Sequence, residues 1–556
     1  MPRVCLRSFA APIVLLAVLA SPLIFTHAQR NGTDTYAITN ARIVTVGGPV
    51  IDRGNVVIRD GLIVAVGANA PVPADARVID GSGLTVYPGL IDANTSLGIP
   101  EPAPTPSPTG GFLASLQARP ATATTAPNST QVPGLQPEIL AEDLIKPGGD
   151  ALEYERSVGV TTALTAPRSG IWIGQSALIN LAGETPQQMI VRSPVAMHVG
   201  FTPLRGAYPG SLMGVFAALR QMLLDAQRYR EAQRIYDQST RGSRRPAPDR
   251  SLEALLPVLD GRVPVVMYAD REREIERALD LANEFKLKPI IAGGLESANL
   301  AERLRRENVP VLLSLNFPKR TTGALPEADP EPLRVLRERV AAPKAAGILA
   351  AAKVRFAFES GGLSLISDFI TNAGKTTENG LAKEDALRAL TLGAAEIFGV
   401  SDRLGSIETG KIANLTIVRG DIFDRRSRVT HVFIDGRPVD LRPILATPTR
   451  DVATGYWQLS VNLGQADQAV ELTLHQEGDR LRGSLQGALG SVDLANGSVT
   501  AGGEISFTAP VTIDGQTTEA SFSGTITGNE MKGTVNITGR APGSFIGRRI
   551  SSVARR

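Results

Sequence analysis

The sequence predicts an α/β protein in which a (β/α)8 barrel is inserted into a small β-sandwich and is followed by an all-β domain. Three observations support this fold class. Short β-rich runs separated by turns fill residues 36–86 and recur at 415–436. Between them, apolar strand-like runs alternate with helical patterns. Beyond residue 447, short alternating runs and Gly-rich turns continue with almost no helical pattern.

The first 28 residues are typical of a signal peptide. Arg3 and Arg7 precede an apolar run at 10–25, and Thr26-His27-Ala28 has the small-residue pattern of a cleavage site. An N-terminal membrane anchor is the alternative, but the run is short and is broken by two prolines. We therefore expect cleavage after Ala28, an exported protein that is periplasmic or secreted, and no membrane span in the mature chain.

Charge and cysteine content exclude several functions. The formal net charge of +3 falls by two when Arg3 and Arg7 are removed, and this near-neutral balance argues against a nucleic-acid partner. The single cysteine, Cys5, lies inside the predicted signal peptide. The mature chain therefore has no disulfide, no thiol nucleophile and no thiolate metal ligand.

The two flanking β segments are expected to form one domain. Residues 29–86 and 400–445 each contain too few strands to fold alone, so we predict that they pair into a composite β-sandwich. The turns at Arg59-Asp60-Gly61 and Asp435-Gly436 indicate hairpins on the two sides of this domain.

Residues 87–399 are the predicted barrel. Eight runs are the expected strands: 87–93, 160–165, 177–181, 195–199, 263–269, 288–292, 309–315 and 354–358. Helices are expected at 212–236, 272–285 and 300–307. Residues 100–147 are predicted to form a long Pro-rich loop over one end of the barrel.

Residues 447–556 are the predicted C-terminal domain. Six short alternating runs with Gly-rich turns favour a compact antiparallel barrel or sandwich. Tyr456 and Trp457 open the first of these runs, where an aromatic side chain can either fill a core or anchor a ligand.

Three segments resemble the amidohydrolase superfamily, in particular its imidazolonepropionase-like branch. Val86-Tyr87-Pro88-Gly89-Leu90-Ile91-Asp92-Ala93 is similar to the first barrel strand of that family, 386–411 to its returning segment, and 429–439 to its closing strand pair. The resemblance implies a TIM-like barrel inserted into a β-sandwich. It also implies hydrolysis of non-peptide C–N bonds, as in cyclic amides, in deamination or in the cleavage of dipeptides.

The family's metal-binding positions carry other residues here. The resemblance implies one or two divalent metals held by a His-x-His pair, a Lys or Glu, two further histidines and an aspartate. The corresponding positions hold Asn94 and Ser96 on strand one, His198 on strand four, Tyr268 on strand five, Gly293 and Gly294 after strand six, and Gly361 near the aspartate position of strand eight. One barrel histidine cannot build a histidine-based site, so no metal-binding residue is assigned.

The remaining polar residues near the strand ends are the candidates for a site. His198, Asp270, Glu296 and Glu359 are candidate catalytic residues, because carboxylates converging at the barrel mouth could bind Ca²⁺ or Mg²⁺ or act as a general acid/base pair. Asn94, Ser96 and Tyr268 are candidate binding residues. The structural alternatives are that Asn94 and Ser96 hydrogen-bond neighbouring strands and that His198 is a core histidine.

Three functional hypotheses follow. The first is an exported pseudoenzyme with a small-molecule ligand at the barrel mouth or a protein partner, and no cofactor beyond the divalent metal that the resemblance implies. The second is an active hydrolase that uses the residual carboxylates and His198 with an atypical metal or none. The third makes the C-terminal domain a binding module anchored by Tyr456 and Trp457. Homo- and hetero-oligomers both remain open.

Overall fold

The computed structural model describes residues 34–551 except 101–128, 130, 205–206, 240, 243, 319–331, 364–365, 425–426, 442–450, 463–467, 478–479, 488–489, 501–502, 514–515 and 538–542. The predicted signal peptide and much of the predicted loop 100–147 lie outside the described residues. Within the described ranges, none of the helices combines the length and hydropathy that crossing a membrane requires.

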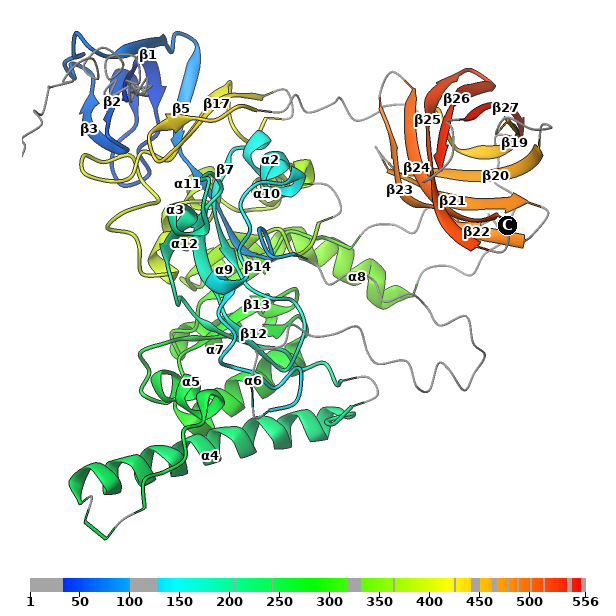
Figure 1. Ribbon diagram of the computed structural model, residues 1–556. Helices are drawn as coiled ribbons and strands as arrows, with labels where there is room; N and C mark the ends of the chain where they lie inside the picture. The colour runs from blue at the N-terminus through cyan, green and yellow to red at the C-terminus, as the bar shows by residue number, and fades with distance from the viewer. Residues whose placement is uncertain are drawn as a thin grey trace, which may run out of the picture.

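A composite sheet joins the two ends of the barrel segment (Figure 1). Its strands are β1 (Thr35–Ile43), β2 (Ile51–Arg59), β3 (Leu62–Gly67), β4 (Arg77–Asp80), β5 (Leu84–Pro88), β16 (Leu415–Arg419), β17 (Arg428–Ile434) and β18 (Arg437–Pro438). The order is β18-β17-β16-β5-β1-β2-β3, with β4 on β1. β5 and β16 pair antiparallel, so strands from both flanking segments share one sheet, as predicted.

Two hairpin turns lie against each other in this sheet. Asp60 and Gly61 have φ values of 50° and 84°, and Asp435 and Gly436 have 49° and 74°, as a type I′ turn requires. A Cβ on Gly436 would lie 2.7 Å from Gly61 Cα, so only glycine permits this approach. The Ala413 amide donates to the Gly61 carbonyl at 2.8 Å and ties the second segment to the first turn.

The barrel has eight strand positions around one interior. They are β6 (Leu90–Thr95), β7 (Val160–Thr165), the consecutive β8 (Trp172–Gln175) and β9 (Ala177–Asn180), β11 (Met197–Val199), β12 (Val265–Ala269), β13 (Pro289–Gly293), β14 (Val311–Ser314) and β15 (Phe356–Glu359). β10 (Ile190–Arg192) pairs with β9 outside the ring. The predicted fold class, a barrel inserted into a small β domain with an all-β C-terminal domain, is confirmed.

The third strand position corrects the expectation of a parallel barrel. β9 pairs antiparallel with β7, and β8 pairs antiparallel with β11. Residues 166–171 between β7 and β8 are too few for the crossover of a dozen or more residues that a parallel neighbour needs. The chain therefore turns back directly, and no helix covers this connection.

The first predicted strand, 87–93, is also corrected, because it is two strands. β5 ends at Pro88 in the composite sheet, and β6 begins at Leu90 in the barrel. Gly89 lies between them, and a Cβ there would meet Thr161 Oγ1 at 2.2 Å. Glycine therefore allows the chain to leave one sheet and enter the other beside β7.

Helices cover the outside of the barrel. They are α2 (Asp150–Ser157), α3 (Pro186–Met189), α4 (Leu212–Gln238), α5 (Arg250–Leu259), α6 (Glu272–Phe285), α7 (Ala301–Arg306), α8 (Leu333–Ala341), α9 (Ala345–Ala351), α10 (Ser367–Glu378), α11 (Lys383–Ala389) and α12 (Leu392–Ile397), with short 3-10 turns at Ala141–Asp143, Ser297–Leu300 and Ala342–Lys344. Because strand residues alternate between two faces, Val266 and Ile290 pack inward while their neighbours pack against helices. Ala394 and Ala395 of α12 join the inner cluster and help to fill the barrel.

The C-terminal domain is a closed antiparallel barrel (orange and red in Figure 1). Its strands are β19 (Gly455–Asn462), β20 (Gln468–Glu477), β21 (Arg480–Gly487), β22 (Gly490–Asp493), β23 (Ala495–Val499), β24 (Glu504–Ile513), β25 (Gln516–Thr527), β26 (Glu530–Ile537) and β27 (Gly543–Ser551). β20 pairs with both β19 and β21, which closes the ring, while β22 adds only to β21.

Trp457 is a core residue of this second barrel. It is 0% exposed, its Nε1 donates to the Ala453 carbonyl at 2.9 Å, and the Arg549 guanidinium lies 4.5 Å from its ring centroid. A side chain held in this way cannot anchor a ligand on the surface. The structure therefore removes the basis for treating Trp457 as a binding residue.

Candidate functional site

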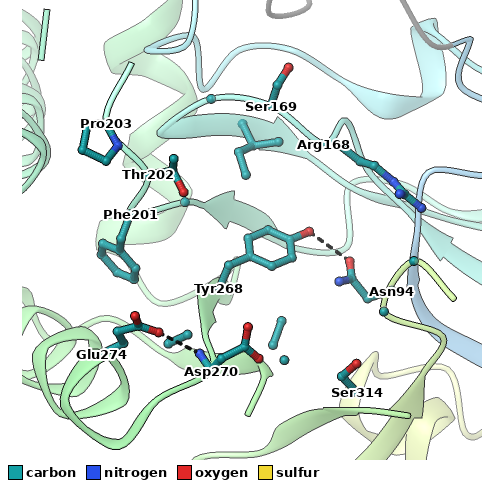
Figure 2. A pocket seen from close by; sticks show the side chains of 18 of the residues that line it. Asn94, Arg168, Ser169, Phe201, Thr202, Pro203, Tyr268, Asp270, Glu274 and Ser314 are labelled. Carbon is teal, nitrogen blue, oxygen red and sulfur yellow. Dashed lines mark hydrogen bonds between the residues drawn. The ribbon is translucent and has the colours of Figure 1, made fainter. Parts of the chain in front are cut away.

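A cavity of about 1480 Å³ opens at the carboxyl ends of the barrel strands (Figure 2). Its floor is polar and is made by residues at the strand ends, including Asn94, Tyr268, Asp270, Ser314 and Glu359. Its side is apolar, formed by residues that follow β11 or open α4 together with neighbouring side chains: Ile173, Phe201, Pro203, Leu204, Leu212 and Phe216. The cavity therefore offers separate surfaces for a polar and an apolar part of one ligand.

A chain of hydrogen bonds crosses the floor at the family's metal-binding positions. The Tyr268 hydroxyl donates to Asn94 Oδ1 at 3.0 Å, a contact drawn in Figure 2. The same hydroxyl lies 3.0 Å from His198 Nδ1. Because the hydroxyl proton is directed to Asn94, Nδ1 of His198 carries a proton and donates to Tyr268. Three residues from β11, β12 and β6 are thereby held together.

His198 is a neutral, buried histidine. Its side chain is 0% exposed, and burial lowers its pKa to about 3. With the proton on Nδ1, Nε2 is an acceptor, and it has no hydrogen-bond partner among the described residues. His198 does not line the cavity, because Tyr268 stands between them. It therefore positions Tyr268 and does not meet a ligand in this conformation.

Glu359 is the most deeply buried of the acids that line the cavity, at 2% exposed. Its Oε1 accepts from the Gly293 amide at 3.1 Å, whereas Oε2 has no partner in the described parts of the chain. Burial raises its pKa to about 8, the Asn94 side chain opposes this, and the Asp92 and Asp270 carboxylates add to it. At neutral pH Glu359 is therefore mostly protonated, and Oε2 is buried without a hydrogen-bond partner among the described residues.

Asp92 connects the first and last strands of the barrel. Its Oδ1 accepts from the Ser360 amide at 3.0 Å and from the Asn94 amide at 3.3 Å. Burial raises its pKa to about 6, partly offset by these hydrogen bonds. Asp92 thus holds β6 beside β15 and fixes the backbone of Asn94.

The other candidates lie in different places. Asp270 lines the cavity, and its pKa is raised by burial and then by the Glu274 carboxylate, which accepts from the Asp270 amide at 3.2 Å. Glu296 does not line the cavity, because its Oε2 accepts from the Glu272 amide at 2.8 Å at the start of α6. Ser96 lies beyond β6 and is also outside the lining. The expected single cluster of four residues does not form.

Several lining residues were not anticipated from the sequence. Phe201 and Phe216 stack with ring centroids 5.1 Å apart and planes 14° apart, and they form the aromatic part of the wall. Arg168 follows β7, and Asn316 follows β14. Each follows a barrel strand or opens the next helix, where loops build the sites of such barrels. Their position just after a strand or near the start of a helix was the one feature of the sequence that could have indicated a role in the site.

The donor set does not fit the family's metal centre. Among the described residues, no group of three or more His, Cys, Asp or Glu side chains is placed to hold a metal ion. Nδ1 of His198 is engaged by Tyr268, and an amide and a phenol occupy two former histidine positions. These groups are poor ligands for Zn²⁺ compared with imidazole or thiolate.

Comparison with known proteins agrees with the fold. The model of the Amidohydrolase family matches residues 296–439. An amidohydrolase structure from Thermotoga maritima MSB8 is 25% identical, with a TM-score of 0.61, and covers 73% of this chain and 100% of its own. A prolidase complexed with N-methylphosphonate-L-proline is 17% identical, with a TM-score of 0.44, and the match covers 73% of this chain and 100% of that protein. A putative prolidase from Bifidobacterium longum is 16% identical, with a TM-score of 0.41, and the match covers 73% of this chain and 94% of that protein.

The barrel inserted into a composite sheet, with a cavity at the strand ends, is the architecture expected from the resemblance to amidohydrolases. The family model match and the structure from Thermotoga maritima support assignment to the amidohydrolase superfamily, in agreement with the predicted resemblance at that level. The imidazolonepropionase-like branch stays a prediction.

Proposed function

We propose that this protein is an exported member of the superfamily that has lost metal-dependent hydrolysis and binds a small molecule at the barrel mouth. The observation that carries the proposal is the chain His198–Tyr268–Asn94, which occupies the metal-binding positions with groups that bond to one another. A hydrogen-bonded tyrosine and amide cannot lower the pKa of a water molecule as a divalent metal does. Hydrolysis by that route therefore lacks its central component.

The cavity itself supports retention of a ligand. Loss of catalysis alone would leave no reason to maintain about 1480 Å³ with an aromatic wall and a polar floor. Concave sites of this kind, with apolar walls and a few convergent polar groups, are typical of small-molecule binding.

The proposal of export rests on the predicted signal peptide, and N-terminal sequencing of secreted protein should begin at Gln29.

Metal addition tests the loss of hydrolysis. Zinc, nickel and manganese, each added to purified protein, should raise neither the melting temperature nor hydrolysis of hydantoin-like, imidazolone-like or Xaa-Pro dipeptide substrates. Binding to the folded state would raise the melting temperature whether or not the correct substrate was chosen. A metal-dependent rise that His198→Ala abolishes would contradict the proposal.

One observation favours a second candidate, a hydrolase that works without a tightly held metal. Glu359 lines the cavity and has a pKa near 8, so it is protonated at neutral pH and can donate a proton to a leaving group. Asp270, which directly follows β12, would then have to act as the base. This candidate predicts turnover that persists in chelator and is lost in Glu359→Gln but retained in Glu296→Gln.

A further inference from the structure

The barrel-mouth cavity contains one deeply buried acceptor with nothing to accept from. Glu359 Oε2 has no partner in the described parts of the chain, although Oε1 of the same carboxyl is hydrogen-bonded to Gly293. Glu359 lines the cavity although it is 2% exposed, so this carboxyl lies at the boundary between the cavity and the barrel interior. A buried polar atom without a partner is rare in native proteins, and a missing ligand is one explanation for it.

We propose that the cavity binds an amphipathic organic cation, with a guanidinium or ammonium head at Glu359 and Asp270 and an aromatic or alkyl body against Phe201 and Phe216. This inference rests on the proposed small-molecule function and names the class of ligand. The head supplies the donor that Oε2 lacks and compensates two acids on one side of the floor. The stacked Phe201–Phe216 pair provides the apolar surface for the body.

The charged groups around the cavity decide between a cation and an anion. Arg168, Asp270, Glu274, Arg277 and Glu359 line it. Arg168 is exposed, whereas Glu359 is 2% exposed. A charge acts more strongly where water is excluded, so Glu359, once it is ionised near pH 8, outweighs the exposed arginine at the rim. An anion held by Arg168 is the competing outcome.

Binding of a cation is expected to release a proton. The titratable and charged groups around Glu359 are Asp92 on β6, His198 on β11, Tyr268 on β12, Asp270 directly after β12, and Arg168 after β7. His198 is neutral and Asp92 is ionised above about pH 6, so Glu359 is the group that titrates near pH 8. A cation favours its ionised form, and affinity therefore rises with pH up to about 8 and then levels off.

Calorimetric titration with three matched probes tests the inference. The probes are 2-phenylethylguanidinium, the neutral isostere N-(2-phenylethyl)urea, and the anion 3-phenylpropionate. The guanidinium keeps its charge across the pH range. At about pH 8 it should bind at least about tenfold more tightly than the urea. Between about pH 8 and pH 6 its affinity should fall by roughly tenfold or more, while that of the urea stays constant.

Two variants separate the head from the body. Glu359→Gln keeps the acceptor for Gly293 and should remove the preference for the cation over the urea. Phe201→Ala should weaken both probes to a similar extent, and Glu296→Gln, outside the cavity, should change neither. The melting temperature of each variant shows whether it is folded.

Each remaining outcome overturns the inference in a recognisable way. Tighter binding of 3-phenylpropionate would mean that the cavity selects anions through Arg168, and small-molecule binding would still stand. Unchanged cation preference in Glu359→Gln would remove Glu359 from the site. Failure of all three probes to bind at millimolar concentration would reject both the proposed ligand class and the proposed role of the apolar wall in binding. The loss of metal-dependent hydrolysis would then still be decided by metal addition.

Discussion

The protein contains two β-barrels whose interiors have opposite characters. The C-terminal barrel is filled by apolar side chains, and its largest one, Trp457, has its only polar atom hydrogen-bonded. The inserted barrel is apolar at one end, but at the other end it buries His198, Glu359 and Asp92, each with one polar atom that has no partner in the described part of the chain. Buried polar atoms without partners are rare in packed interiors, and groups with strongly shifted pKa values cluster at functional sites. The comparison points to the inserted barrel as the functional one and to the C-terminal barrel as a packed structural unit.

The largest expected effect lies in the packed barrel. Trp457→Ala removes a side chain that is 0% exposed and should lower the free energy of unfolding of that barrel by about 3–5 kcal/mol. The measurement is denaturant unfolding followed by far-UV circular dichroism. Binding of the phenyl probes at the other barrel should be unchanged in the variant. Loss of probe binding would show that the two barrels are not functionally separate.

The pH dependence of stability probes the polar floor. Glu359 has a folded pKa of about 8 against an ordinary 4.5, so the folded state binds the extra proton between these values. Its contribution is present at low pH and is lost as pH rises through this window. Between about pH 6 and pH 8 the free energy of unfolding should fall by on the order of 2 kcal/mol.

His198 and Asp92 set the lower limit of this window. His198 has a folded pKa of about 3 and loses stability only as pH falls below its ordinary 6.5, and Asp92 changes charge near pH 6. Neither explains a decline between about pH 6 and pH 8. Burial also raises the pKa of Glu155 well above its ordinary value, so that acid keeps a share of any decline. Glu359→Gln should therefore reduce the decline in urea unfolding curves, and a decline of unchanged size in the variant would assign it to another group.

A smaller effect is expected from Tyr268→Phe. The change removes one hydroxyl and leaves Asn94 Oδ1 and His198 Nδ1 without their shared partner. We expect a loss of about 1–3 kcal/mol in thermal or chemical unfolding, with the barrel still folded. Tyr87→Phe, a buried tyrosine of the composite sheet, is the matched control for loss of a phenol. An unaffected Tyr268→Phe would mean that the hydrogen-bond chain contributes nothing to the floor.

The smallest effect should come from Glu296→Gln. Its Oε2 caps the start of α6 from outside the cavity, and a glutamine oxygen can still accept from the Glu272 amide. Stability should change by less than about 1 kcal/mol, and probe affinity should stay the same. Altered affinity in calorimetry would bring Glu296 back as a site residue.

Much of this fold could be predicted from the sequence because its signals are local. Apolar runs matched the observed strands to within a few residues, and α6 (Glu272–Phe285) begins and ends where its pattern indicated. The reversed third strand was missed, because direction depends on the length of residues 166–171 and not on their hydropathy. The break at Gly89 was missed because it depends on contact with Thr161, which is distant in the chain.

The site was harder to predict for a similar physical reason. A shift of one residue along a strand moves a side chain to the opposite face, so strand-end acids such as Asp270 and Glu359 could be proposed but not placed. Glu296 follows a strand end too, yet its backbone turns it toward α6. The wall made by Phe201 and Phe216 carries no motif and depends on how α4 returns across the barrel mouth.

Metal content is the most direct test of the central claim, which is that hydrogen bonds have replaced the metal centre. Protein purified and dialysed without chelator should contain well under one zinc, nickel or manganese per chain by elemental analysis. This follows because His198, Tyr268 and Asn94 bond to each other and no third strong ligand converges with them in the described structure. One equivalent of metal per chain, lost in His198→Ala, would contradict the claim and make this barrel a metal-dependent hydrolase.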